Sequence, residues 1–390
     1  MRPTAKRRLD ACNNIGDLRR VAHKRLPAPI FHYMDGAADD EISLGRNTSA
    51  FDDYELLPSY LREISSIDLK TRVLGVDLDL PFFLAPTGMS RLFHHDKEPG
   101  VARAAARHGT LYSLSTVGTT SIEDVAAATT GPKMFQIYIF KDRELTREFV
   151  QRCKDAGYTS LCLTVDTPLA GNRERDNITG MTIPPRFSLA SLWSFASHPG
   201  WAFHLLRDRD FRMANVAHRV DALRDSTMGL MDYINSQFDR TVTWDDAAWI
   251  IEEWGGPFAI KGLQTADDAR RAKDAGASAI MISNHGGRQL DTTPAPVDCL
   301  APMRDAVGDS LELIVDGGIR RGSHVVKALA LGANACSIGR PYLFGLAAGG
   351  EKGVSRAIEI LASEVERTMA LMGVNHVRAL GPDAVRRITR

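Results

Sequence analysis

Residues 283–291 read SNHGGRQLD and place an imidazole, His285, three residues before a guanidinium, Arg288. Histidine titrates near neutral pH, which suits a general base, and arginine can hold a carboxylate through two hydrogen bonds. The two glycines between them make the backbone pliable. A lone histidine is more often structural, but this combination indicates a base beside a bound substrate carboxylate.

Three further residues could belong to the same centre. Asp166, in LTVDTP, could hold the imidazole in the required tautomer and stabilise its protonated form. Arg173, in GNRERD, could reach the same carboxylate as Arg288. Lys261 follows the apolar run PFAI, where it would stabilise negative charge on a reduced cofactor unless it is simply a solvated lysine.

A phosphate site is indicated by DGGIRRG at 316–322 and IGRP at 338–341. Their glycines would let backbone N–H groups approach a phosphate, while Arg320 and Arg340 would supply charge and donors. Glycines that merely turn the chain are the simpler interpretation. Arginines in both segments favour the phosphate.

Apolar runs alternate with helical segments over most of the chain, which is typical of a parallel sheet buried on both faces. Eight such units predict a (β/α)8 TIM barrel, whose active site would form at the C-terminal ends of the strands. A doubly wound open sheet is the alternative, but no GxGxxG follows the first strand to hold a dinucleotide. The expected strands are 80–88, 110–116, 133–139, 160–166, 257–262, 278–284, 311–318 and 335–339.

We expect one domain over 1–390, with an N-terminal helical cap at 14–60 and the barrel at 80–390. Residues 167–243 form an insertion after strand four that is far too long for a plain βα loop. Its part 187–212 is either a lid over the site or a patch on the inner face of the cytoplasmic membrane. The residues that favour a membrane patch are Trp193, Phe195, Trp201, Phe203, Leu205 and Leu206, followed by Arg207, Arg209 and Arg212.

Composition narrows the class of partner. Lys+Arg and Asp+Glu number 48 each, so no basic excess predicts nucleic-acid binding, and a small molecule is favoured. Five dispersed cysteines indicate a reducing compartment rather than a disulfide framework. No metal is expected, because ligand spacing is lacking around His285 and FHHD at 93–96 is interpreted as a loop. No run of about 18 apolar residues could span a membrane, which predicts a cytoplasmic protein.

Taken together, these motifs resemble those of the FMN-dependent α-hydroxy-acid oxidising enzymes. The resemblance rests on SNHGGRQLD, LTVDTP, FQIYIF, DGGIRRG, KALALGA and IGRP. It extends over nearly the whole chain, from RLPAPIFHYMDGAADDE at 25–41 to TMALMGV at 368–374. FHYMDG and SHPGWAF are most similar to the respiratory L-lactate dehydrogenases of bacteria.

The resemblance implies FMN as cofactor and a role for individual residues. His285 would be the base that starts oxidation at the α-carbon, paired with Asp166, and Tyr138 would hydrogen-bond the reacting substrate. The residues implied to bind substrate with His285 are Tyr33, Tyr138, Arg173 and Arg288. The residues implied to contact FMN are Ala85, Thr87, Ser115, Gln136, Thr164, Lys261, Ser283, Asp316, Gly317, Gly318, Arg320, Gly339 and Arg340.

We therefore expect FMN-dependent oxidation of an L-2-hydroxy acid, L-lactate to pyruvate first, by a homotetramer that passes electrons to a quinone or another respiratory acceptor. An oxygen-using 2-hydroxy-acid oxidase that releases hydrogen peroxide is the alternative. Val117 and Gly118 lie where glycolate oxidase is bulkier, which leaves room for more than glycolate. The sequence leaves open whether the α-hydrogen leaves as a proton or as a hydride to the flavin, with His285 then deprotonating the hydroxyl.

Two functions from other classes are also compatible with a barrel. One is a non-catalytic barrel that binds a phosphorylated metabolite, and the colour of the purified protein would distinguish it from a yellow flavoenzyme. The other is a phosphosugar isomerase or lyase, which would leave Lys261, Gln136 and Ser115 without a role.

Overall fold

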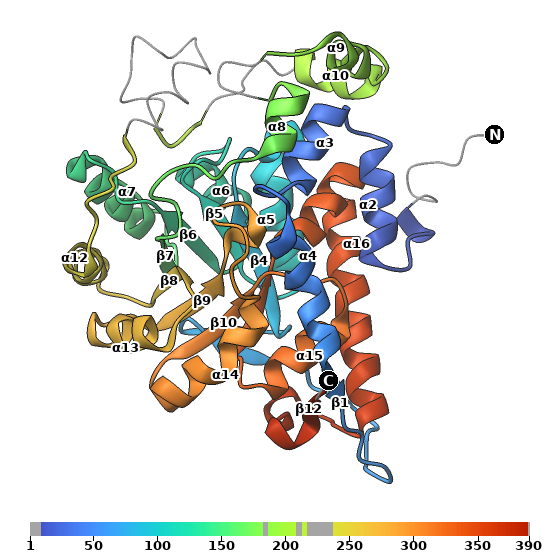
Figure 1. Ribbon diagram of the computed structural model, residues 1–390, viewed down its shortest axis with the longest axis vertical. Coiled ribbons are helices and arrows are strands. Elements are labelled where there is room, and N and C mark those ends of the chain that lie inside the picture. The colour runs from blue at the N-terminus through green and yellow to red at the C-terminus, as the bar shows by residue number, and fades with distance from the viewer. Residues whose placement is uncertain (1–8, 182–185, 208–212, 217–236, 389–390) are drawn as a thin grey trace.

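The computed structural model describes residues 9–181, 186–207, 213–216 and 237–388 (Figure 1). Its centre is a closed barrel of parallel strands in the order β10-β11-β4-β5-β6-β7-β8-β9. The predicted TIM barrel is confirmed, and the open-sheet alternative is wrong because β11 pairs with β4 and closes the ring. The barrel strands are β4 (Phe82–Thr87), β5 (Tyr112–Ser115), β6 (Lys133–Ile137), β7 (Ser160–Thr164), β8 (Phe258–Leu263), β9 (Ala279–Ser283), β10 (Glu312–Asp316) and β11 (Ala335–Ile338).

The barrel strands are apolar on both faces because side chains fill the barrel and helices cover it. Every residue of β5, β6, β7 and β9 is buried. Phe83, Cys162 and Met281 belong to the cluster inside the barrel, and Cys162 Sγ lies 3.6 Å from Met281 Sδ. Cys336 is buried in the larger outer cluster. Cys162 and Cys336 are therefore small core residues.

Helices surround the barrel and bring the chain back to the start of each next strand. Their N-termini are fixed by side chains: Asp142 accepts the N–H groups of Glu144 and Leu145, and Thr265 accepts that of Asp268. The long helix α16 is interrupted at Gly349 and Gly350. The surrounding helices are α5 (Lys97–Arg107), α6 (Ile122–Ala128), α7 (Arg143–Asp155), α12 (Trp244–Trp254), α13 (Ala266–Asp274), α14 (Pro296–Val307), α15 (Gly322–Ala330) and α16 (Arg340–Met372).

The N-terminal segment forms the helices α2 (Ile15–His23), α3 (Ala28–Asp35) and α4 (Ile42–Ser49), which lie along one side of the barrel (Figure 1). Helix α2 packs against α16. The Asp291 carboxylate, which follows β9, accepts the N–H groups of Ile42 and Ser43 and so caps α4. The helical cap is therefore bonded directly to the loop that carries His285.

Two small antiparallel sheets complete the fold. In one, β1 (Tyr54–Leu56) pairs with β12 (Val385–Arg387), so the end of the cap and the C-terminal segment form one sheet. In the other, β2 (Thr71–Val73) pairs with β3 (Val76–Leu78). Leu74 and Leu78 pack into the cluster inside the barrel, so this hairpin closes the N-terminal end of the barrel.

The described part of the insertion forms α8 (Glu174–Thr179), α9 (Leu189–Ala196) and α10 (Pro199–Arg207). Helices α9 and α10 lie above the cap at the top of Figure 1. The Ser194 hydroxyl accepts the N–H of Ala28, which joins α9 to α3. Within the described ranges, no helix has the length and apolar character needed to cross a membrane.

Candidate active site

The residues predicted for the site come together at the C-terminal mouth of the barrel. A cavity of about 280 Å³ opens there. Of the predicted residues, only Asp166 and Ser283 lie behind its wall, and each is bonded to a residue that lines it. The predicted residues that line the cavity are Tyr33, Ala85, Thr87, Ser115, Gln136, Tyr138, Thr164, Arg173, Lys261, His285, Arg288, Asp316, Gly317, Gly318, Arg320, Gly339 and Arg340.

His285 is oriented by two neighbours, Asp166 and Ser283. Its Nδ1 lies 2.9 Å from Asp166 Oδ1, and its backbone N–H donates to Ser283 Oγ over 3.0 Å. Its φ of 58° is in the left-handed region that side chains other than glycine rarely adopt. Because Nδ1 is bonded to Asp166, Nε2 is the nitrogen left for the cavity. Burial raises the pKa of Asp166, but His285 and Lys261 outweigh this and hold it below its usual value.

Lys261 is a buried ammonium in the wall of the cavity. Its Nζ donates to Ser283 Oγ over 2.9 Å and lies 3.0 Å from Asp316 Oδ2. Burial lowers the pKa of Lys261, but the carboxylates of Asp316 and Asp166 outweigh it and raise the pKa above the usual value. The interpretation of Lys261 as a solvated lysine is wrong.

Adjacent strand ends present an amide and hydroxyl groups beside Lys261. Ser115 Oγ donates to Gln136 Oε1 over 2.8 Å, which fixes the amide and turns Nε2 away. Gln136 Nε2 and Thr164 Oγ1 are buried without a hydrogen-bond partner among the described residues. An unpaired buried donor costs about 1–3 kcal/mol. These atoms are therefore placed to receive a polar ligand.

Two arginines flank the ring of Tyr33 at the outer part of the cavity. The guanidinium carbons of Arg288 and Arg173 lie 5.1 and 5.6 Å from the ring centroid. Arg288 Nη1 also donates to the carbonyl of Tyr33 over 2.7 Å. Tyr138 is buried across the cavity, and burial together with Asp166 raises the pKa of its phenol. The arrangement offers cations and hydroxyl groups to a small carboxylate.

Positive charge accumulates where a phosphate was predicted. Burial lowers the pKa of Arg320 to about 10, and burial together with Arg288 and Arg320 lowers the pKa of Arg340 to about 9. A bound anion would relieve this repulsion between guanidinium groups. Gly318 is required by packing as well as by the predicted phosphate site. A Cβ at this position would lie 1.7 Å from the carbonyl oxygen of Asn47.

Two residues at the site, Asn47 and Phe238, could not be found from motifs. Asn47 and Asn284 exchange two hydrogen bonds of 2.7 Å, and Asn284 Oδ1 also accepts the N–H of Gly287. They join the cap to the turn that carries His285. Phe238, in the insertion, lines the cavity and packs against Tyr138 at 5.1 Å between ring centroids. Asn284 belongs to SNHGGRQLD, whereas the only signal for Asn47 and Phe238 is their place in the expected cap and near the end of the insertion.

The segment FHHD lies in the loop expected for it, before α5. The structure nevertheless gathers His94, His95 and Asp96, whose ligand atoms all lie within 4.8 Å of one another. The His95 ring stacks between those of His94 and His204, with centroids 4.2 and 4.3 Å apart. His94 Nδ1 accepts the N–H of Asp96, and burial lowers the pKa of His94 to about 4. This cluster connects the loop to α10.

The apolar residues of 187–212 divide into two groups. Phe195 and Trp201 pack against the core, and Trp201 Nε1 donates to the carbonyl of Leu92 over 2.7 Å. Trp193 and Phe203 are exposed, at 75% and 60%. The predictions for the Leu206 and Arg207 side chains and for Arg209 and Arg212 lie outside the described residues.

A closed barrel with a histidine–aspartate pair, a buried cation and a basic corner at one mouth is the arrangement expected of a cofactor-dependent barrel enzyme. The chain belongs to the family described as FMN-dependent dehydrogenase, which it matches over residues 22–387. The family is FMN-dependent and oxidises 2-hydroxy acids.

The relatives include enzymes with different named substrates. An L-lactate dehydrogenase of Xanthomonas campestris is 40% identical over 378 residues, covering 96% of this chain and 97% of the relative. Glycolate oxidase 3 of Oryza sativa subsp. indica is 38% identical over 366 residues, covering 94% of each chain. A solved structure, described as the monotopic membrane protein (S)-mandelate dehydrogenase, superposes with a TM-score of 0.93 at 34% identity, covering 97% of this chain and 100% of the other.

The cavity fits FMN on its own evidence. The unpaired Gln136 Nε2 and Thr164 Oγ1 offer hydrogen bonds to the polar edge of a flavin ring. Lys261 supplies a fixed positive charge beside them. Arg320 and Arg340 place charge where a phosphate would sit. The cavity thus offers donors for a flavin ring, a fixed cation and a basic corner for a phosphate.

Proposed function

We propose that this protein oxidises L-lactate to pyruvate. The observation that carries the proposal is the His285–Asp166 pair, 2.9 Å apart, at a cavity whose outer part holds Arg173 and Arg288. The named relatives support a 2-hydroxy acid as substrate, and an L-lactate dehydrogenase with 40% identity supports L-lactate among them.

The chain's own residues would bind and orient the substrate. Arg288 and Arg173 would hold the carboxylate, and the phenols of Tyr33 and Tyr138 would donate hydrogen bonds to its oxygens. Oxidation of a 2-hydroxy acid to a 2-oxo acid releases two electrons and two protons. His285 Nε2 would take one proton, and the Asp166 carboxylate would stabilise the resulting imidazolium.

FMN, when bound, would supply the acceptor for the two electrons and the second proton of this oxidation. The residues that would hold it are those of the cavity wall. Gln136 and Thr164 would bond the flavin ring, and Lys261 would stabilise negative charge that develops on it. Arg320 and Arg340 would bind the phosphate. The remaining residues assigned to FMN are Ala85, Thr87, Ser115, Ser283, Asp316, Gly317, Gly318 and Gly339.

We further propose that electrons pass from FMN to a quinone. Steady-state turnover should be measured with L-lactate, glycolate and (S)-mandelate, each with oxygen alone and with a soluble quinone. This tests the substrate and the electron acceptor together. The proposal expects the highest kcat/KM with L-lactate and the quinone. Fast turnover with oxygen alone would instead identify a peroxide-forming oxidase, and a higher kcat/KM with another acid would refute L-lactate.

We propose that α9 and α10 rest on a lipid surface. Leu189, Leu192 and Trp193 share one face of α9 by their spacing and are exposed, as is Phe203 of α10. These side chains form an apolar patch on a projecting pair of helices, where a soluble loop would be polar. The solved relative described as a monotopic membrane protein supports this assignment.

Flotation with anionic liposomes tests the lipid surface. Wild type should float, and Trp193→Ser/Phe203→Ser should remain at the bottom of the gradient. Leu371→Ser is the matched control, since Leu371 is also an exposed apolar residue, at 70%, but belongs to α16. A wild type that stays at the bottom would make this segment a lid. The homotetramer stays a prediction, which analytical ultracentrifugation would test.

A further inference from the structure

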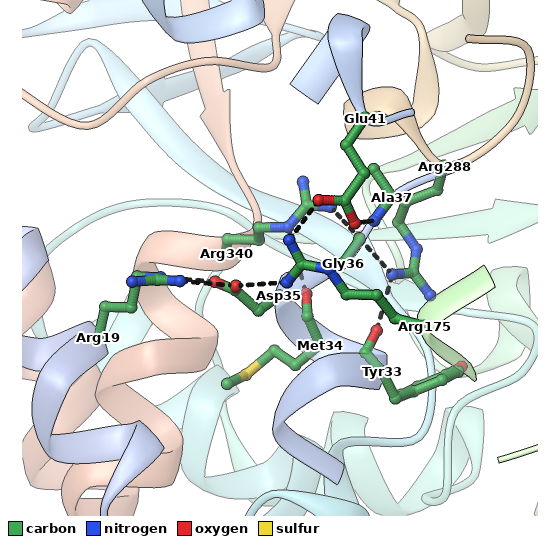
Figure 2. Close-up of polar contacts among 10 residues, drawn as sticks. All are labelled: Arg19, Tyr33, Met34, Asp35, Gly36, Ala37, Glu41, Arg175, Arg288 and Arg340. Atoms are coloured by element: carbon green, nitrogen blue, oxygen red, sulfur yellow. Dashed lines mark hydrogen bonds and ion pairs between the residues drawn. The ribbon is translucent and has the colours of Figure 1, made fainter. Parts of the chain in front are cut away.

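The C-terminal end of α3 receives two arginines from the barrel (Figure 2). Arg340 donates to the carbonyl of Met34 through Nε and to that of Gly36 through Nη2, over 3.2 and 2.7 Å. Arg288 Nη1 donates to the carbonyls of Tyr33 and Gly36, over 2.7 and 3.1 Å. The last carbonyls of a helix lack partners within it and carry partial negative charge, so guanidinium groups suit them.

The Gly36 carbonyl oxygen is thus shared by two arginines with different proposed ligands. Arg340 belongs to the phosphate corner, and Arg288 belongs to the substrate end of the cavity. Arg340 Nη1 is also bonded, to the carbonyl of Gly286 in the His285 turn. A shift of the α3 end would therefore displace the guanidinium groups of Arg288 and Arg340 together.

Asp35, which does not line the cavity, joins the end of α3 to two further arginines (Figure 2). Its carboxylate receives Arg19 through two hydrogen bonds, of 2.7 and 2.8 Å, and Arg175 at 3.3 Å. Arg175 also bonds the Glu41 carboxylate, which accepts the N–H of Ala37. Burial raises the pKa of Asp35, but Arg19 and the other nearby arginines outweigh it and keep the carboxylate ionised.

We propose that Asp35 is a positioning residue that sets substrate-carboxylate binding and cofactor-phosphate binding together, by holding the α3 carbonyls that orient Arg288 and Arg340. Of the described residues at this end of α3, Tyr33 and Met34 line the cavity and Asp35 does not. Asp35 therefore acts on substrate and cofactor binding indirectly, through Arg288 and Arg340. The substrate half of this inference rests on the proposed function, and the phosphate half rests on the FMN dependence of the family.

The test compares Asp35→Asn with wild type in three measurements. They are the Kd for FMN after reconstitution, the Kd for oxalate from flavin difference spectra, and the KM and kcat for L-lactate. Oxalate serves as a non-reacting carboxylate. The Kd for FMN, the Kd for oxalate and the KM should each rise about tenfold, as expected for weakened charge-assisted hydrogen bonds. The kcat should change far less, because the lost interaction is made equally before and during the reaction.

Glu351→Gln is the matched control. The Glu351 carboxylate also lies between two arginines, Arg103 and Arg107, but away from the cavity. Glu351→Gln should lower the melting temperature without changing the Kd for FMN, the Kd for oxalate or the KM for L-lactate. If Asp35→Asn behaves like this control, or changes only one of FMN and carboxylate binding, the inference is overturned.

Two milder variants keep the inference testable if Asp35→Asn does not fold. Arg19→Met and Arg175→Met remove single partners of Asp35 at partly exposed positions. Each substitution should weaken FMN binding and oxalate binding in parallel. Unchanged FMN and oxalate binding in either variant would overturn the inference. A wild type that does not oxidise L-lactate would refute the proposed substrate only, because the FMN and oxalate titrations do not require turnover.

Discussion

The barrel half and the cap half of the site are built differently. On the barrel half, neighbouring strand ends bond to one another through side chains, as in the Lys261–Ser283–Asp316 group. On the cap half, arginines from the barrel bond to backbone carbonyls of α3. The barrel half is therefore specified by side-chain identity. The cap half is specified by where a helix ends, so different kinds of substitution should damage the two halves.

The largest effect is expected from His285→Gln on the barrel half. Loss of the general base should lower turnover by about 10²–10⁴-fold. The FMN content should stay unchanged, because His285 is not among the residues assigned to the cofactor. Stopped-flow reduction of the flavin by L-lactate and the absorbance of the purified protein measure the two quantities. Retention of more than about a tenth of wild-type turnover would remove His285 from its assigned role.

Arg288→Lys tests the junction of the two halves. Arg288 must bond the Tyr33 and Gly36 carbonyls and still present donors to a substrate, which a lysine ammonium cannot do at once. We expect KM for L-lactate to rise roughly tenfold or more, with a fall in kcat. Steady-state kinetics provide the measurement. Unchanged kinetics would place Arg288 outside the substrate site.

Asn47→Ala tests the side-chain contact that joins the cap to the His285 turn of the barrel half. It removes the paired amide bonds to Asn284 and leaves a buried amide without its partner, which should lower the free energy of unfolding by about 1–3 kcal/mol. Urea denaturation measures this change. Asn13→Ala is the control, since Asn13 is exposed and its side chain bonds only locally. Equal effects of the two substitutions would show that the amide pair does not hold the cap.

The smallest effect is expected from acid. The pKa of Asp166 is lowered in the fold, so its carboxylate contributes stability that is present above its unfolded pKa, about 3.9, and lost as pH falls through the folded value. Asp166→Asn should therefore lose less stability than wild type between about pH 5 and pH 3. Urea denaturation across this range is the measurement. Parallel pH profiles for the two proteins would contradict the expected contribution.

The barrel half could be predicted from the sequence because its signals are local. Apolar runs mark the strands, and the polar residues at their ends, such as Lys261, must meet at one mouth once the barrel closes. The sequence could not predict the full roles of Arg340 and Gly318, because these depend on contacts with residues far away in the chain. Arg340 contacts the Met34 carbonyl across 306 residues of sequence, and Gly318 is constrained by the carbonyl of Asn47. Backbone carbonyls carry no residue identity, so no motif reports such contacts.

In the insertion, too, the sequence could not predict which contacts the residues make. Its composition indicated apolar contact but could not divide the residues between core and surface. The structure separates Trp201, which donates to the Leu92 carbonyl, from Trp193, which is exposed. That division depends on how α10 docks on the loop after β4, which is a tertiary contact.

The pairing of β1 with β12 has a consequence for the order of synthesis. Glu55 and Arg386, which pair across this sheet, are separated by 331 residues. At about 5–20 residues per second, a ribosome needs roughly 20 to 60 seconds to make the intervening chain. Strand β1 therefore leaves the ribosome before β12 is made and gains this partner only when residues 385–387 emerge. During that interval β1 presents a strand edge without its partner in this two-stranded sheet.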